Sequence, residues 1–207
     1  MVKNLFLTLC CTLSLYSFAP DRHPAVTQEY IERFEDLAVA EMFRSGIPAS
    51  IKLAQALHES QSGTSPLAQK ANNHFGIKCK SWWTGNTYYH KDDDLNNRGE
   101  LIESCFRSYN SVVESYLDHS DFLMYRSRYA PLFELSRTDY KAWAHGLQNL
   151  GYATDKRYAE KIIRLIETHR LHRFDNQSFD RIPEQLSGVK IPENYQRNDG
   201  NDTDAQE

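Results

Sequence analysis

The sequence predicts a mainly α domain of the α+β class, with a small antiparallel β lobe that flanks a cleft. Apolar residues recur every three or four positions over residues 27–45 and 48–63, and again after Ser111, as in amphipathic helices. Between these regions, over residues 74–109, short aromatic or β-branched runs are separated by Gly and Asn, as in small sheets. A β lobe inserted between helices places the natural cleft between the two parts.

The helices before the β lobe have clear start and stop signals. Gly46 follows the first apolar stripe, which spans residues 27–45, and is a typical C-cap. Pro48 suits the first position of the second helix, which reaches Gly63 and carries Glu59 near its end. A Ser-Pro pair at 65–66 then opens a short helix that ends near Ala71.

The β lobe and the later helices follow from similar signals. Ser111 and Glu114 form a capping box, after which helical spacing resumes. The predicted β runs are residues 74–80, 87–90 and 101–109, and three further helices are expected near residues 129–135, 138–150 and 155–172.

The chain of 207 residues divides into three expected segments. Residues 1–19 combine Lys3, an apolar run and the small-residue pattern Ser-Phe-Ala, the layout of a secretory signal peptide. Residues 24–175 are long enough for one catalytic domain. Residues 176–207 hold seven acidic and three basic residues with few large apolar ones, which predicts an acidic, disordered tail.

Two cysteines near the start leave the processing of the leader open. Cys10 and Cys11 allow lipidation as an alternative to plain cleavage, but Leu9 stands where a lipoprotein signal generally has a small residue. Lipidation is therefore the weaker interpretation. We expect an exported protein of the periplasm or cell envelope, or a secreted one, with no transmembrane segment once the leader is removed.

Charge and cysteine content narrow the functional classes. The acidic excess lies in the tail and the charges of the rest of the chain balance, so no basic surface for nucleic acid is indicated. We also expect a monomer. Beyond the leader only Cys79 and Cys105 remain. In an oxidising compartment they are candidates for a disulfide, the alternative being two separate buried thiols.

Glu59 is the first candidate for a catalytic group. A carboxyl group partly shielded by apolar neighbours holds its proton at higher pH and can donate it to a glycosidic oxygen. A Glu near a helix end is nevertheless most often a solvated surface residue. His58-Glu59 begins like a zinc-protease helix, but position 62 is Ser rather than the second His. No metal site and no cofactor are therefore predicted.

Five ordered sequence blocks resemble the pattern of glycoside hydrolase family 73. They are AQALHES at 54–60, SPLA at 65–68, NHFGIK at 73–78, FRSY at 106–109, and GYATD at 151–155 followed by Tyr158 and Ala159. The resemblance spans about residues 29–169 and looks closest to the β-N-acetylglucosaminidase domains of flagellar rod-assembly hydrolases and autolysins. It implies a lysozyme-like fold and an endo-β-N-acetylglucosaminidase that cleaves the N-acetylglucosaminyl-β-1,4-N-acetylmuramic acid bond of peptidoglycan.

The resemblance also assigns roles to individual residues. The family's general acid falls on Glu59. Its second acidic residue falls in the run Asp92–Asp94, with Asp92 the first choice and Asp93 the second, although many relatives have Glu there. A solvated turn or a chance cation site is the alternative for these aspartates. Whether the reaction is inverting, retaining or assisted by the substrate's N-acetyl group stays open.

Aromatic residues are the candidates for sugar binding. In the family signature the tyrosines line the cleft, which implies this role for Tyr152 and Tyr158, although the helical spacing of Tyr158 with Ile162 equally fits a core position. Trp82 and Trp83 lie in a loop bounded by Gly. We expect one of them to stack on sugar and the other to pack within the β lobe.

Two other functions compete with the glucosaminidase hypothesis. A lytic transglycosylase also uses a Glu followed by Ser on a lysozyme-like helix, but it cleaves the neighbouring muramic acid linkage without water. The second is a catalytically silent wall-binding module. The products formed from sacculi, and clearing of murein gels by wild type and Glu59→Gln, distinguish the three.

Overall fold

A computed structural model describes residues 22–96 and 98–178; the side chains of residues 22–24 and 92–95 are outside the described part. The predicted leader, residues 1–19, and nearly all of the predicted tail also lie outside it. The elements are α1 Arg22–Ser45, α2 Ala49–Ser60, α3 Pro66–Ala71, β1 Thr87–Leu95, β2 Leu101–Arg107, α4 Val112–Met124, the 3-10 helix η1 Ser127–Glu134, α5 Tyr140–Asn149, α6 Tyr158–Thr168 and the 3-10 helix η2 Leu171–Phe174.

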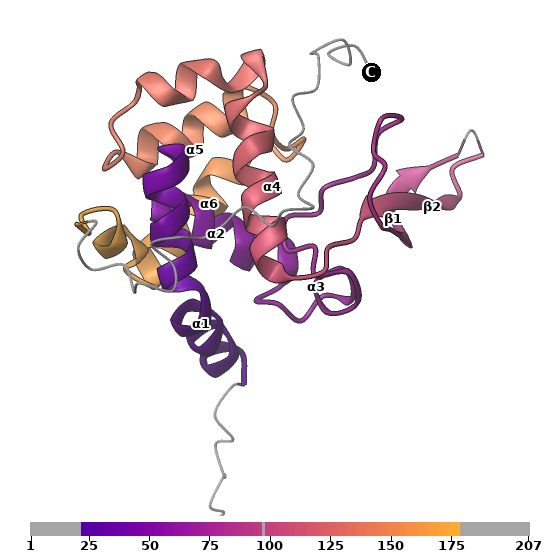
Figure 1. The fold of residues 1–207 in the computed structure, drawn as a ribbon, viewed down its shortest axis with the longest axis horizontal. Helices are drawn as coiled ribbons and strands as arrows, with labels where there is room; N and C mark the ends of the chain where they lie inside the picture. The colour runs from indigo at the N-terminus through magenta and orange to yellow at the C-terminus, as the bar shows by residue number, and fades with distance from the viewer. Residues whose placement is uncertain (1–21, 97, 179–207) are drawn as a thin grey trace, which may run out of the picture.

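The helices form one body, and the two-stranded sheet projects from one side of it (Figure 1). Helix α2 runs through the middle of the helical body and packs against α1, α5, α6 and η2. Its apolar residues are almost completely buried, among them Ile51, Leu53, Ala54 and Leu57. The mainly α architecture with a small antiparallel β element, predicted from the sequence, is confirmed.

The expected start and stop signals operate at the first helices. Gly46 adopts a φ of +83°, and its N–H donates to the carbonyl oxygen of Met42, which ends α1. The side chain of Ser65 accepts a hydrogen bond from the N–H of Ala68 at 3.2 Å, with Pro66 next to it at the start of α3. The predicted boundaries of these helices are therefore right to within a few residues.

The capping box before α4 is formed in a modified way. Ser111 Oγ accepts from the N–H of Glu114 at 3.4 Å, as expected. Glu114 Oε2 accepts from the N–H of Asn110 at 3.0 Å, one residue earlier than in the standard motif. One backbone donor in the first turn of α4 and one just before the helix are therefore satisfied.

The strand predicted over residues 74–80 is wrong. Strands β1 and β2 pair antiparallel, with Thr87 opposite Arg107 and Lys91 opposite Glu103. Residues 74–80 contribute one isolated bridge between Lys78 and Phe106 instead of a strand. The side chain of Asn73 bonds backbone groups of Ile77, within this segment, and also the distant carbonyl oxygen of Arg107, and together these bonds hold the segment as a loop.

The helices after α4 also differ in detail from the prediction. Residues 127–134 form a 3-10 helix with Pro131 inside it, since proline removes a backbone donor. The last predicted helix is divided, because Arg170 adopts a left-handed conformation between α6 and η2. Among the described helices, none has the length and apolar character needed to cross a membrane.

Candidate active site

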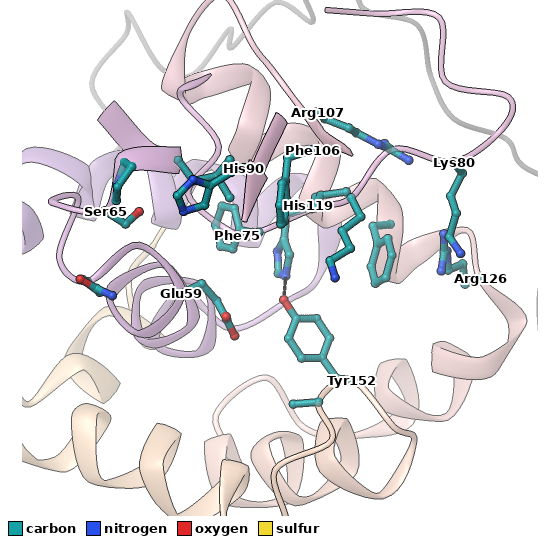
Figure 2. A pocket seen from close by; sticks show the side chains of 18 residues that line it. Glu59, Ser65, Phe75, Lys80, His90, Phe106, Arg107, His119, Arg126 and Tyr152 are labelled. Carbon is teal, nitrogen blue, oxygen red and sulfur yellow. Dashed lines mark hydrogen bonds between the residues drawn. The ribbon is translucent and has the colours of Figure 1, made fainter. Parts of the chain in front are cut away.

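Glu59 lies at the second-to-last position of α2 and lines a cleft of about 530 Å³. The helix ends there because Gln61 and Ser62 adopt left-handed φ values of 52° and 56°. The Glu59 side chain is half-buried. Figure 2 shows its carboxyl group pointing into the same space as the hydroxyl of Tyr152, which comes from the loop after α5.

Most of the charged side chains that line the cleft are basic. Among the described residues of the lining, Glu59 is the single carboxylate. The basic residues there are Lys78, Lys80, Arg107 and Arg126. The basic lining suits an anionic substrate, and Glu59 is the one carboxyl group of this described lining that could donate a proton to it.

The entry to the β lobe is held by one asparagine and one glycine. Asn73 Nδ2 donates to the carbonyl oxygens of Ile77 and Arg107, both at 2.9 Å, and its Oδ1 accepts from the N–H of Ile77. Gly76 has a φ of +65°, a left-handed conformation that permits a tight turn here. This turn brings residues 75–78 to the wall of the cleft.

Phe75 connects this wall to the helices. Its ring stacks on the His119 ring with centroids 4.0 Å apart, and the Lys52 ammonium group lies 5.2 Å from its centroid. Because Lys52 belongs to α2, Phe75 packs against the helix that carries Glu59. Cys79 and Cys105 form the expected disulfide, which ties the loop to β2.

The two tyrosines predicted to bind sugar differ in position. Tyr152 is half-buried and lines the cleft, and its hydroxyl lies 3.0 Å from His119 Nε2. Tyr158 is only 1% exposed, and its hydroxyl accepts a hydrogen bond from Gln55 Nε2 at 2.9 Å. The rings of the two tyrosines are 5.4 Å apart, so Tyr158 supports Tyr152 from the core.

Both tyrosines lie within electrostatic range of Glu59. Burial raises the pKa of Tyr158, and the Glu59 carboxylate raises it further. Burial, then Tyr158 and then Glu59, raise the pKa of Tyr152. Both hydroxyls are therefore protonated at neutral pH and available as donors. Direct contact of Tyr158 with substrate stays a prediction.

Trp82 and Trp83 both pack on Arg107. The Arg107 guanidinium carbon lies 4.7 Å from the Trp82 ring centroid and 4.5 Å from that of Trp83. Nη1 of Arg107 donates to both carboxylate oxygens of Asp118 at 2.7 Å. Trp83 also donates from Nε1 to the carbonyl oxygen of Asn86. These contacts give both rings a structural role, and sugar stacking by one of them stays a prediction.

Asp92 and Asp93 lie in strand β1, and their side chains are outside the described part. His90, on the same strand, lines the cleft. The pairing of β1 with β2 is irregular between Lys91 and Leu95, so the alternation of a regular strand does not decide which aspartate shares the face of His90. Among the described residues, no group of three or more His, Cys, Asp or Glu side chains could hold a metal ion.

The sequence did not indicate the roles of His119 and Lys52. His119 is fully buried in α4 at the base of the cleft, in contact with both Phe75 and Tyr152. Lys52 is fully buried in α2 and lies 2.7 Å from His119 Nδ1. The only signal in the sequence is that Lys52 stands between Ile51 and Leu53, and a lysine on a helix is ordinarily a solvated residue.

Comparison with known proteins identifies the family. The model of the glucosaminidase family, described as mannosyl-glycoprotein endo-beta-N-acetylglucosaminidase, matches residues 35–171, well over half of the chain. The chain belongs to the glucosaminidase family, glycoside hydrolase family 73. The match contains α2 with Glu59, the β lobe and the loop with Tyr152, so this glucosaminidase domain includes every wall of the cleft.

Individual relatives agree with this assignment. Exo-glucosaminidase LytG of Bacillus subtilis is 36% identical over 69% of this chain and 49% of its own length. Peptidoglycan hydrolase FlgJ of Vibrio cholerae is 30% identical over 70% of this chain and 42% of its own. The chain thus spans about half or less of these curated relatives. The catalytic domain of the autolysin Auto from Listeria monocytogenes superposes with a TM-score of 0.65 at 28% identity, covering 75% of this chain and 91% of that one.

Proposed function

We propose that the chain is a peptidoglycan hydrolase that cleaves the β-1,4 bond between N-acetylglucosamine and N-acetylmuramic acid, with Glu59 as the general acid. The observation that carries the proposal is the position of Glu59, the single carboxylate of the described cleft lining. Relatives named exo-glucosaminidase and peptidoglycan hydrolase support the substrate class. The basic lining suits a polymer whose muramic acid and stem peptides carry carboxylates.

In the proposed reaction Glu59 donates its proton to the oxygen that links the two sugars. The bond from that oxygen to C1 of N-acetylglucosamine breaks, and water supplies the new hydroxyl at C1. Tyr152 holds the sugar next to Glu59 through a hydrogen bond from its hydroxyl group. The products are a reducing N-acetylglucosamine end and a muramic acid with a free 4-hydroxyl.

Gel zymography with purified sacculi tests the role of Glu59. Wild type should clear the gel. Glu59→Gln keeps the shape of the side chain but has no acidic proton to donate, so its activity should fall by about a hundredfold or more. Glu160→Gln is the matched control, because Glu160 is exposed on α6 and away from the cleft lining. Equal clearing by wild type and Glu59→Gln would remove Glu59 from the mechanism.

Product analysis tests the bond that is cleaved. Reduction of digested sacculi with borohydride should label N-acetylglucosamine at the new ends. Anhydro-muramic acid ends would instead identify a lytic transglycosylase, and no products from soluble wild type would indicate a wall-binding module. We propose endo cleavage, in line with the family description, so long glycan fragments should precede disaccharides in a time course.

We further propose that Asp92 or Asp93 is the second acidic group. Their strand also carries His90, which lines the cleft. Asp92→Asn and Asp93→Asn, assayed separately on sacculi, should differ: the functional one lowers kcat strongly and the other leaves it close to wild type. Wild-type kcat in both variants would contradict the assignment and leave substrate assistance as the mechanism.

We also propose that the chain acts in the cell envelope after export and as a monomer. The Cys79–Cys105 disulfide supports an oxidising compartment. Cell fractionation should find the protein outside the cytoplasm, and intact mass should show that residues 1–19 are removed. Light scattering should give the mass of one chain, whereas a cytoplasmic, full-length or dimeric protein would contradict the respective part.

A further inference from the structure

A buried row of hydrogen bonds connects α2 to the cleft through α4. Lys52 lies two helical turns before Glu59 on α2 and is fully buried. Its Nζ lies 2.7 Å from His119 Nδ1 and 2.7 Å from Ser120 Oγ, and 3.4 Å from the carbonyl oxygen of Tyr116. These three partners take up the three N–H directions of an ammonium group.

The charges around Lys52 balance only when it is an ammonium ion. Four charged side chains meet in this cluster, of which three are fully buried and Arg44 is partly exposed: Glu41, Arg44, Lys52 and Asp121. Arg44 pairs with Glu41 at 2.7 Å and with Asp121 at 2.8 Å. Ser120 donates to Glu41 Oε2 at 2.6 Å and so accepts from Lys52. With two carboxylates and one guanidinium in place, a neutral Lys52 would leave a net negative charge in the interior, which is costly.

An ammonium ion at Lys52 fixes the tautomer of His119. An ammonium group only donates, so His119 Nδ1 must accept. Burial, followed by the neighbouring charge of Lys52, lowers the pKa of His119 well below its usual value, so the ring is neutral. Its one proton is then on Nε2, which donates to the Tyr152 hydroxyl oxygen at 3.0 Å.

The donated bond determines what the Tyr152 hydroxyl does in the cleft. A phenolic hydroxyl that accepts from His119 directs its own proton away from that ring. Figure 2 shows the His119–Tyr152 hydrogen bond at the base of the pocket, with Glu59 beside it. The proton of Tyr152 is therefore free to point at an acceptor in the cleft.

We propose that Lys52 and His119 are positioning residues that set the Tyr152 hydroxyl as a hydrogen-bond donor to the carbonyl oxygen of an N-acetylated sugar. Lys52 fixes the tautomer of His119, and His119 fixes the direction of the Tyr152 hydroxyl proton. Of the three residues, Tyr152 alone contacts substrate. The proposal rests on the glucosaminidase function for the identity of the ligand. The direction of the hydrogen bonds from Lys52 to His119 and from His119 to Tyr152 does not depend on that function.

The tautomer of His119 directly tests the direction of these hydrogen bonds. Long-range ¹H–¹⁵N spectra of the full chain at pH 6, with the ring assigned by His119→Gln, report which nitrogen carries the proton. Burial lowers the pKa of Lys52 to about 7, against the opposing influence of Glu41, so the ammonium form prevails at pH 6. A neutral ring protonated on Nε2 is expected. A ring protonated on Nδ1, or an imidazolium, overturns the proposal.

A double variant that preserves the net charge of the buried cluster tests the effect on catalysis. Lys52→Met alone would leave an excess carboxylate in the core, so it is combined with Glu41→Gln, which removes one negative charge. The double variant should lose the fixed Nε2–H tautomer and lower kcat/KM on glycan strands about three- to tenfold, the worth of one hydrogen bond. Lys141→Met with Glu167→Gln is the matched control, because it removes an exposed pair joined at 3.0 Å.

The same double variant in a Tyr152→Phe background separates positioning from a merely structural role. If Lys52 acts through the Tyr152 hydroxyl, the double variant should cause no further loss once that hydroxyl is absent. An equal loss in both backgrounds overturns the proposal. If wild type does not cleave glycan at all, the proposed function fails, whereas the tautomer of His119 still decides the direction of these hydrogen bonds. The wild-type spectrum also decides it if the double variant does not fold.

Discussion

His74 should make the domain sensitive to acid. Its side chain is 5% exposed and lies among the rings of Tyr30, Phe34 and Tyr116, with centroids 5.5 to 6.5 Å away. Burial, with a smaller effect of the Arg33 charge, lowers the pKa of His74 to about 4 from an ordinary value of 6.5. Below pH 6.5 the unfolded chain therefore binds a proton that the folded chain does not.

The sign and size of the effect follow from this difference in pKa. Because the folded pKa is the lower one, the stabilisation is present above pH 6.5 and is lost as the pH falls toward 4. The full difference corresponds to about 3.4 kcal/mol at about 1.36 kcal/mol per pH unit. Between pH 7.5 and 4.5 the expected loss from His74 alone is about 2.5 kcal/mol.

Urea unfolding at a series of pH values measures this loss. The comparison is between wild type and His74→Gln, which keeps an acceptor for the Tyr30 hydroxyl, bonded to His74 Nδ1 at 2.6 Å. The variant should be less stable at pH 7.5 but should lose about 2.5 kcal/mol less between pH 7.5 and 4.5. His145→Gln is the control, because His145 is exposed and its surroundings change little on unfolding. Parallel curves for wild type and His74→Gln would refute the reasoning.

Two further predictions concern stability. Cys79 and Cys105 are 26 positions apart, so reducing their disulfide should lower the free energy of unfolding by about 3 kcal/mol, measured by urea unfolding with and without reductant; a loss below about 1 kcal/mol would show that the loop stays ordered by other contacts. Asp118→Ala should cost about 3–5 kcal/mol, because Arg107 is left charged and buried without its carboxylate. Thermal unfolding of Asp118→Ala and the wild type checks this value, and an unchanged midpoint would contradict it.

The sequence predicted the elements whose signals are local. The apolar stripe of α2, Ser65 at the start of α3 and Gly46 after α1 each act over one or two helical turns, and the structure contains them within a few residues. The strand predicted over residues 74–80 failed for a nonlocal reason. Asn73 bonds the carbonyl oxygen of Arg107, 34 positions away, and this contact is invisible to periodicity.

The candidate site divides in the same way. The sequence alone singled out Glu59 and Tyr152 through motifs that resemble a family to which the chain does belong. It singled out the Cys79–Cys105 pair through the number of cysteines beyond the predicted leader. Only the tertiary structure brought His119 and Lys52 to the base of the cleft, 67 positions apart in sequence and 2.7 Å apart in space. Their ordering of Tyr152 depends on which buried charges meet between α1, α2 and α4. The spacing of apolar residues predicts which face of a helix is buried, whereas the tertiary packing determines which residues that face contacts.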